Sequence, residues 1–271
     1  MKQDQKKPST AQIKRPLKQL VRFGWEQALS CLFPVVVFAS LAFTQMMPLP
    51  FLPRYDWLLI IFLVMQGWMV RSGLETRDEL KVITLFHLIG LALEVYKVHM
   101  GSWSYPEEGY FKIFGVPLYS GFMYASVASY LCQAWRRLKI ELVRWPPFWA
   151  VVPLAAAIYF NFFTHHYWMD VRWWLFGLVM VVFWPSRVNY EVDGSRYRMP
   201  IAFSFVLIGF FIWIAENIAT FFGAWKYPNQ AEAWKIVHLG KVSSWILLVI
   251  VSFLIVATLK QVKGDSCQKA K

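Results

Sequence analysis

The sequence predicts an all-α, polytopic membrane protein of about eight transmembrane helices, built as two parallel four-helix repeats with a small β-hairpin on the inner face. Three observations predict this class. The composition is 58% hydrophobic and only 16% charged, which is more apolar than an ordinary soluble domain. The apolar residues form blocks of membrane-spanning length. Finally, one thirteen-residue pattern occurs twice.

Eight apolar blocks are separated by short polar connections. They lie at 27–48, 55–70, 79–100, 115–135, 147–166, 171–186, 200–222 and 237–259. Several of them approach the roughly 17–25 residues that cross a bilayer as a helix. We therefore expect a basic cytoplasmic tail (1–26), a first four-helix repeat (27–136), a second four-helix repeat (146–260) and a second cytoplasmic tail (261–271).

The net charge of +12 follows the expected topology. With the N-terminus inside, the inner segments carry twenty-one Lys and Arg residues and the outer loops carry five. This asymmetry is the positive-inside rule of membrane proteins, so the basic surplus indicates orientation and not nucleic-acid binding. We expect a multi-pass protein of the bacterial cell membrane with both termini in the cytoplasm, in contact with membrane lipids. Protein partners are unknown.

The N-terminal segment, from Met1 to Trp25, is basic with an apolar side that is typical of a helix lying in the membrane interface. The first apolar block is too long for a cleaved signal peptide. Three cysteines, Cys31, Cys132 and Cys267, fall on the inner side of this topology. We expect them to be free thiols because that compartment is reducing.

The repeated pattern reads E-x6-G-x-W-x-Y-P. The first copy runs from Glu94 to Pro106 and the second from Glu216 to Pro228, 122 residues later. Each copy places an acid about two turns before a Gly/Trp/Tyr/Pro helix end. Four crossings per repeat is an even number, so both copies point the same way and a pseudo-twofold axis along the membrane normal follows.

The two acids are the candidate catalytic residues, because an ionisable group within a membrane helix is costly and is a functional candidate by default. Glu94 has Lys97 one turn away, whereas Glu216 is followed by Asn217. Two acids in unlike surroundings suit the roles of acid and base. The alternative is that ion pairs and hydrogen bonds of these acids only hold the aromatic helix ends. The supporting candidates are Lys97, His99, Trp103, Tyr105, Asn217, Trp225, Tyr227, His165, His166 and His238.

Histidines and carboxylates near the outer helix ends suit zinc, iron or manganese. His165, His166 and Asp170 nevertheless match no tight ligand spacing, so we expect neither a metal nor a cofactor. The sequence has no nucleotide-binding loop and no hydrolase or zinc-peptidase signature. The segment Asn189 to Met199 alternates around Asp193-Gly194, which predicts the inner-face β-hairpin.

Four stretches resemble an uncharacterised family of bacterial multi-pass membrane proteins, catalogued only as a domain of unknown function. The stretches are LETRDELKVITLFHLIGLALEVYKVHMGSWSYP, GVPLYSGFMYASVASY, NFFTHH and GFFIWIAENIATFFGAWKYPNQ. This resemblance covers nearly the whole chain. It implies a location in the bacterial cell membrane and no established activity.

A more remote resemblance covers about a third of the chain. An acid followed by G-x-W-x-Y-P and then by Gly115 to Leu118 is similar to the membrane domains of heterodimeric-type lycopene cyclases and bisanhydrobacterioruberin hydratases. This resemblance implies proton chemistry on carotenoid chains without a redox cofactor. The cyclase pattern continues with paired acids, where this chain has Tyr119 and Ser120. Of the acids in that pattern, only Glu94 and Glu216 are therefore matched in this chain.

Three functions remain open. The first is a cofactor-independent acid/base enzyme acting on a polyisoprenoid or another lipid-like apolar molecule. In it Glu216 donates a proton, Trp103 and Trp225 face the resulting cation, and Glu94 completes the reaction. The second is a small proton-coupled transporter or permease. The third is a non-catalytic membrane scaffold.

Overall fold

The chain is mostly helical, and each apolar block contains a helix. The computed structural model describes residues 10–269, with side chains described for residues 17–257. The helices are α1 (Thr10–Ser30), α2 (Leu32–Met46), α3 (Arg54–Arg71), α4 (Arg77–His99), α5 (Gly121–Arg137), α6 (Phe148–Thr164), α7 (Arg172–Val182), α8 (Ile201–Phe221) and α9 (Lys241–Lys269). Short 3-10 turns, η1 (Leu118–Ser120) and η2 (Pro228–Gln230), follow the two copies of the motif.

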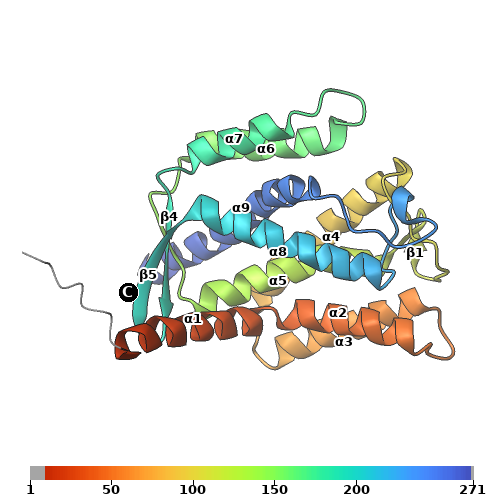
Figure 1. Cartoon of the computed structure of the whole chain (residues 1–271), viewed down its shortest axis with the longest axis horizontal. Helices are drawn as coiled ribbons and strands as arrows, with labels where there is room; N and C mark the ends of the chain where they lie inside the picture. The colour runs from red at the N-terminus through yellow and green to blue at the C-terminus, as the bar shows by residue number, and fades with distance from the viewer. Residues whose placement is uncertain (1–9, 270–271) are drawn as a thin grey trace, which may run out of the picture.

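The helices pack in antiparallel pairs that follow the chain (Figure 1). Helices α2 and α3 form a hairpin on one side of the molecule, and α6 and α7 form another on the opposite side. Between these hairpins α4 packs against α5, α8 against α9, and α5 against α9. From α2 onward successive helices reverse direction, so α4 and α8 end, and α5 and α9 begin, at the end of the bundle that holds β1. We call this the motif-loop end.

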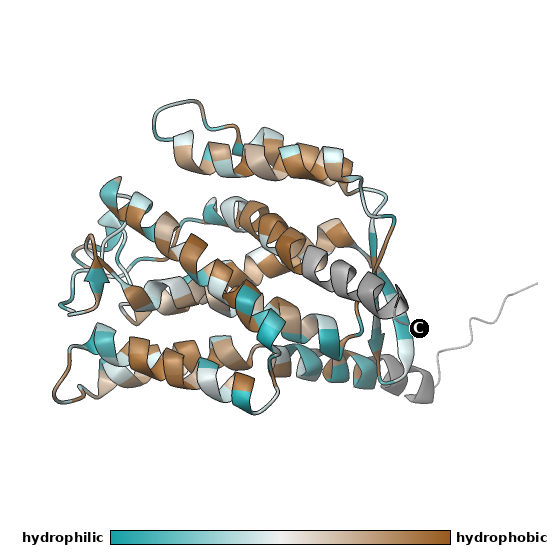
Figure 2. Cartoon of the chain, turned by 180° about the vertical axis from the view of Figure 1, so that it is seen from behind, coloured by the Kyte–Doolittle hydropathy of each residue, from teal (hydrophilic) through white to brown (hydrophobic). Residues whose placement is uncertain are grey.

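Two helices in the described part of the chain, α4 and α8, are long and apolar enough to cross a membrane. The bent pair α1 and α2, with an angle of 66° between them, adds a third candidate. Helices α6 and α7, and the described apolar part of α9, are shorter. Figure 2 shows apolar residues along most of the helices and polar residues gathered at loops and helix ends. Both helices that carry the candidate acids are therefore membrane-span candidates.

Helix α1 presents an exposed apolar side. Leu17, Leu20, Val21 and Trp25 are each more than half exposed, and the helix turns by 66° into α2. A position of α1 in the membrane interface stays a prediction, and residues 1–9 of the predicted tail lie outside the described part. Cys31 and Cys132 are free cysteines, as predicted. The side chain of Cys267 lies outside the described residues.

The predicted β-hairpin is present. Strands β4 (Arg187–Val192) and β5 (Ser195–Pro200) pair in antiparallel fashion around Asp193 and Gly194, which have φ angles of 50° and 73°. Such positive φ angles are typical of a two-residue type I′ turn. A third strand, β3 (Glu141–Val143), pairs with the free edge of β4. The sequence did not predict this strand because three residues carry no periodic signal and the pairing is long-range.

A second small hairpin shifts the start of one helix. Strands β1 (Lys112–Ile113) and β2 (Val116–Pro117) pair across Phe114 and Gly115, both of which have positive φ. The apolar block 115–135 predicted a helix from its first residue, but α5 begins at Gly121. The difference arises because Pro117 lacks a backbone donor and its ring disfavours helical geometry in the residue before it.

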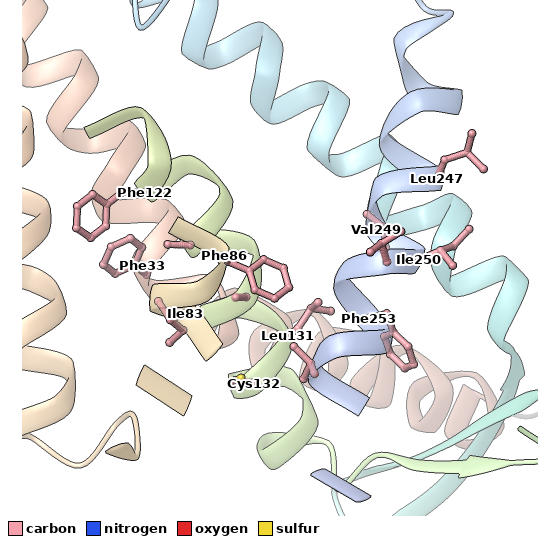
Figure 3. Packing of buried hydrophobic residues seen from close by; sticks show 14 of the residues in the cluster. Phe33, Ile83, Phe86, Phe122, Leu131, Cys132, Leu247, Val249, Ile250 and Phe253 are labelled. Atoms are coloured by element: carbon pink, nitrogen blue, oxygen red, sulfur yellow. The ribbon is translucent and has the colours of Figure 1, made fainter. Parts of the chain in front are cut away.

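The apolar core lies where α2, α4, α5 and α9 meet (Figure 3). Phe33, Ile83, Phe86, Phe122, Leu131 and Cys132 come from α2, α4 and α5, and α9 supplies Leu247, Val249, Ile250 and Phe253. Each of these side chains is nearly or fully buried. The core therefore joins α9 of the second predicted repeat to helices of the first.

A buried polar cluster lies at the opposite end of α4 from the motif loop. Glu75 is 2% exposed and accepts hydrogen bonds from Gln66 and Ser129. The next residue, Thr76, is the N-cap of α4 and forms a capping box with Glu79. Asp78 lies in the first turn of the helix. Burial raises the pKa of the Glu75 carboxyl, against the opposing effect of the hydrogen bonds from Ser129 and Gln66.

We predict that Glu75 makes the protein less stable as the pH rises. Its pKa is higher in the folded than in the unfolded state, so its contribution to stability is complete below about pH 4.3 and is lost as the pH rises through the folded-state pKa. Thermal unfolding of detergent-solubilised protein should show a Tm that falls less steeply with pH in Glu75→Gln than in the native protein. Glu108→Gln, at an exposed position, is the charge-matched control. Equal slopes in the native protein and Glu75→Gln would contradict this assignment.

Candidate functional site

The two motif loops leave their helices in the same way. Gly101 and Gly223 both have a φ angle of 68°, which an L side chain adopts only with strain. The backbone N–H of Ser102 donates to the Lys97 carbonyl at 2.9 Å, and that of Ala224 donates to the Ala219 carbonyl at 2.9 Å. These are Schellman-type helix ends. The glycine of the motif is therefore required by the backbone that turns the chain back over the acid.

The two loops then meet each other. Ser104 and Lys226 occupy the same position in the motif, between its Trp and its Tyr. Their backbones form an antiparallel bridge, with N–H to O=C distances of 2.9 Å and 3.0 Å in the two directions. In addition, the Tyr119 hydroxyl donates to the Ala224 carbonyl. The bridge joins α4 to α8 at the ends that carry the acids.

Glu94 is held by three aromatic donors. Its Oε2 atom accepts from the Trp103 indole at 2.6 Å and from the Tyr105 hydroxyl at 2.7 Å. Its Oε1 atom accepts from the Tyr124 hydroxyl of α5 at 2.9 Å. The residue is only 6% exposed. Two of the three donors are thus the Trp and Tyr of its own motif, which explains why the motif contains them.

Glu216 is held in a related but not identical way. It accepts from the Tyr227 hydroxyl of its own motif and from the Trp245 indole of α9 at 2.8 Å, and it is 3% exposed. The next residue, Asn217, uses its side chain to accept from the Val237 backbone N–H at 2.8 Å. Trp225 packs against the hydrophobic core and is not among the donors to Glu216. The second acid therefore has fewer protein partners than the first.

The two acids lie in one connected aromatic cluster. The ring of Trp103, which binds Glu94, meets the ring of Tyr227, which binds Glu216, edge to face with centroids 5.9 Å apart. The Lys241 ammonium lies 4.9 Å from the Tyr227 ring centroid and 5.6 Å from that of Trp103. Of the two rings assigned from sequence to a cationic intermediate, Trp103 thus already faces a lysine, whereas Trp225 packs against the hydrophobic core.

Lys97 lies one turn after Glu94 on α4 but forms no ion pair with it. Its ammonium donates to the Phe162 carbonyl at 2.8 Å, lies 3.2 Å from His166 Nε2 and stands 4.1 Å from the Phe162 ring centroid. Residues at positions i and i+3 are neighbours on a helix, yet Lys97 contacts Phe162 of α6 and His166, which follows that helix. Lys241 of α9 interacts electrostatically with one of the acids, Glu216.

The outer histidines divide into two groups. The rings of His165 and His166 lie against each other, tilted by 33° with centroids 4.1 Å apart. His166 Nε2 lies 3.2 Å from the Lys97 ammonium. His99 and His238 are exposed and lie outside this contact set. Among the residues that the structure describes, no three His, Cys, Asp or Glu side chains are grouped to hold a metal.

Asp170 belongs to the same region through Arg172. Its carboxylate pairs with the Arg172 guanidinium at 2.6 Å and accepts from the Asn161 amide at 3.2 Å. Burial opposes ionisation of Asp170, but hydrogen bonds from the Arg172 backbone and from Asn161 hold its pKa below the ordinary value. Arg172 also reaches Ser244 on α9 at 3.2 Å. The α6–α7 hairpin is thereby tied to the motif-loop end of α9.

An apolar crevice opens beside the two acids. Its lining comes from α4, α5, α6, α8 and α9, and it includes both Tyr124 and Trp245, the donors to Glu94 and Glu216. The other lining residues are Phe86, Ile89, Leu93, Val127, Tyr159, Ile212, Leu248, Val249, Ser252 and Ile255. An apolar molecule in this crevice would lie against the side chains that hold the two carboxyl groups.

The comparisons with known proteins agree with the family that the sequence resembles. Residues 19–253 match the family described as a protein of unknown function, DUF817. The chain belongs to this family. It is 81% identical over 257 residues, covering 95% of this chain and 97% of the relative, to the uncharacterized protein YoaT of Bacillus subtilis (strain 168). No solved structure matches the chain. The remote resemblance to cyclases and hydratases stays a prediction.

Three residues of the site were missed from the sequence. Tyr124 and Trp245 follow the two acids by 30 and 29 residues, and this near-equal spacing was the available signal. Arg54, counted only as a loop charge, donates five hydrogen bonds: to Thr44, Glu107 and the carbonyls of Leu41, Phe222 and Gly223. These use its full set of donors. Arg54 therefore caps the C-terminal end of α8 and fastens the second motif loop to α2.

We predict that Gly90→Ala breaks the contact between Tyr124 and Glu94. A Cβ at Gly90 would lie 2.4 Å from the Tyr124 ring, one turn before Glu94. The variant should lose about 1–3 kcal/mol of stability to overpacking, measured by thermal unfolding in detergent. Gly67→Ala is the matched control, because a Cβ there meets no atom within 4 Å, and it should gain up to about 1 kcal/mol. Removing the Tyr124 hydroxyl (Tyr124→Phe) should lower the stability little further in the Gly90→Ala background. If the stability losses of the two substitutions are instead fully additive, Gly90→Ala does not act through the Tyr124–Glu94 contact.

Proposed function

We propose that the chain crosses the bacterial cell membrane eight times as two parallel four-helix repeats, 27–136 and 146–260, with both termini in the cytoplasm. Three observations support this architecture. Each apolar block contains a helix, large apolar side chains are exposed along these helices, and the two motif loops pair at equivalent positions. The distribution of Lys and Arg supports the orientation.

Within this architecture we infer a cofactor-independent acid/base enzyme that acts on a lipid-like molecule, of which polyisoprenoids are one class. The observation that carries this function is the burial of two carboxyl groups in one aromatic cluster beside an apolar crevice. Buried ionisable groups are expensive to keep within a membrane. Two such groups near one apolar crevice suit the addition and removal of protons on an apolar substrate.

The chemistry requires only proton transfer. Protonated Glu216 gives a proton to one carbon of a double bond. The Glu94 carboxylate takes a proton either from the carbon beyond the other alkene carbon, so that the double bond shifts, or from a water that adds to that other alkene carbon. One proton enters and one leaves, so neither an oxidant nor a reductant is consumed. Three described side chains donate to Glu94, and hydrogen bonds to the carboxylate favour its charged form, which suits the role of base. Because Lys241 faces Trp103 and Tyr227, a concerted transfer fits the site better than a free cation.

We predict that Glu94→Gln and Glu216→Gln each reduce turnover about 100-fold or more, because each removes a group that transfers a proton. Glutamine keeps the shape of the side chain and one acceptor oxygen, so folding and membrane insertion should persist. The measurement compares lipid extracts of strains that express native or variant protein at equal levels. Glu108→Gln, an exposed change in the loop after the first motif, should leave the extracts unchanged. Extracts that also stay native for both motif variants would exclude the enzyme.

A proton-coupled transporter is the second candidate, and the buried cluster at the far end of α4 favours it. The sequence places histidines and carboxylates near the outer helix ends. The structure adds buried Glu75, Gln66 and Ser129 at the opposite end, as a route across the membrane would require. In proteoliposomes, uptake driven by a proton gradient and abolished by both Glu75→Gln and Glu94→Gln would favour transport over catalysis. If the motif variants alter neither the lipid extracts nor the uptake, a non-catalytic membrane scaffold is the candidate function that remains.

A further inference from the structure

The motif-loop end holds a group of cations that the acid/base chemistry does not use. Lys97, Lys241 and Arg172 lie close enough to repel one another. Arg172 is paired with Asp170, but neither lysine forms an ion pair among the residues that the structure describes. Even with Glu216 ionised, this group keeps a net positive charge.

The two lysine ammonium groups differ in how many of their hydrogen-bond donors have partners. The Lys97 ammonium is buried, with the residue 2% exposed, and uses two of its three donors on the Phe162 carbonyl and His166. The Lys241 ammonium contacts only the aromatic faces of Trp103 and Tyr227, and no hydrogen bond of it is found within the described side chains. Donors of a lysine in this position are available to an anionic oxygen.

Both lysines stand at the head of the helical stripes that line the apolar crevice. On α4 the lining residues Phe86, Ile89 and Leu93 lead to Lys97, four residues further on. On α9, Lys241 precedes Trp245 by four residues, and the stripe continues through Leu248, Ser252 and Ile255. Residues four apart lie on the same face of a helix. The cations and the crevice are therefore two parts of one amphipathic surface.

We propose that the crevice and the two lysines form a binding site for a single-chain amphiphile with an anionic phosphate headgroup. The headgroup binds Lys241 and the free donor of Lys97, and the chain lies along α4 and α9 past Tyr124 and Trp245. This site rests on the proposed function, since it defines the substrate class as an anionic lipid whose chain passes the two acids. From Trp245 to Ile255 the α9 stripe extends about 15 Å, which suits a chain such as dodecyl.

The test titrates dodecyl phosphate into the purified full-length chain in dodecyl maltoside micelles, with tryptophan fluorescence as the readout because Trp103 faces Lys241. Dodecyl maltoside supplies the same chain without charge, so the titration isolates the headgroup. Native protein should show a saturable change. The half-saturating concentration should rise about tenfold in Lys241→Gln, which loses a charge-assisted hydrogen bond, and further in Lys97→Gln/Lys241→Gln.

Two controls separate this site from general electrostatics. Lys226→Gln removes an exposed charge from the neighbouring loop and should change half-saturation less than twofold, since exposed charges are screened. Dodecyltrimethylammonium, which has the same chain and the opposite charge, should give no saturable change. Equal binding of both amphiphiles, or an unchanged value in Lys241→Gln, would overturn the proposal. Inorganic phosphate as effective as dodecyl phosphate would also overturn it in favour of a free-anion site.

Failure of the amphiphile site can be distinguished from failure of the proposed enzyme. Glu94→Gln and Glu216→Gln should both keep dodecyl phosphate binding, because neither residue supplies a positive charge. Binding that persists in these variants while lipid extracts stay native would retain the amphiphile site and reject the chemistry. Binding that is weakened about tenfold in Lys241→Gln, together with altered extracts in the acid variants, supports both.

Discussion

Two carboxyl groups buried in an apolar helical bundle are the constraint on which the rest of this structure depends. A buried polar group costs free energy unless it is hydrogen-bonded. In this chain the donors come from the chain that follows each acid: Trp103 and Tyr105 for Glu94, and Tyr227 for Glu216. A helix that carries such an acid must therefore end soon after it and fold back. The glycine with positive φ makes that return possible.

The same constraint connects distant parts of the fold. The loops that return over the acids meet in a backbone bridge, and Arg54 and Tyr119 hold the second loop through the carbonyls at the end of α8. Helices α5 and α9 complete the two acid sites with Tyr124 and Trp245. Because these two side chains also line the apolar crevice, an occupant of the crevice and the protonation of the acids would influence each other. Binding and proton transfer would then share one set of aromatic side chains.

Features that depend on local residue patterns were predictable from the sequence, and those that depend on long-range competition were not. The apolar blocks located the helices, the duplicated motif located both acids, and Asp193-Gly194 located the β4–β5 turn. The one-turn spacing of Glu94 and Lys97 left an ion pair open as an alternative, but Lys97 contacts the Phe162 carbonyl and His166 instead. Nothing local indicates that α6 passes there. The roles of Arg54 and Gly90 were missed for the same reason, since their partners lie on other helices.

The meeting of the two motif loops is most directly tested by cross-linking Ser104→Cys to Lys226→Cys in a chain whose native cysteines are replaced by serine. These residues exchange both backbone hydrogen bonds, which places their Cα atoms about 5.5 Å apart, within the range that a disulfide spans. The account predicts rapid, nearly complete cross-linking under mild oxidation in membranes. The pair Ser104→Cys and Lys235→Cys should react much more slowly. If the two pairs react equally slowly, the loops do not meet and the two acids do not share one site.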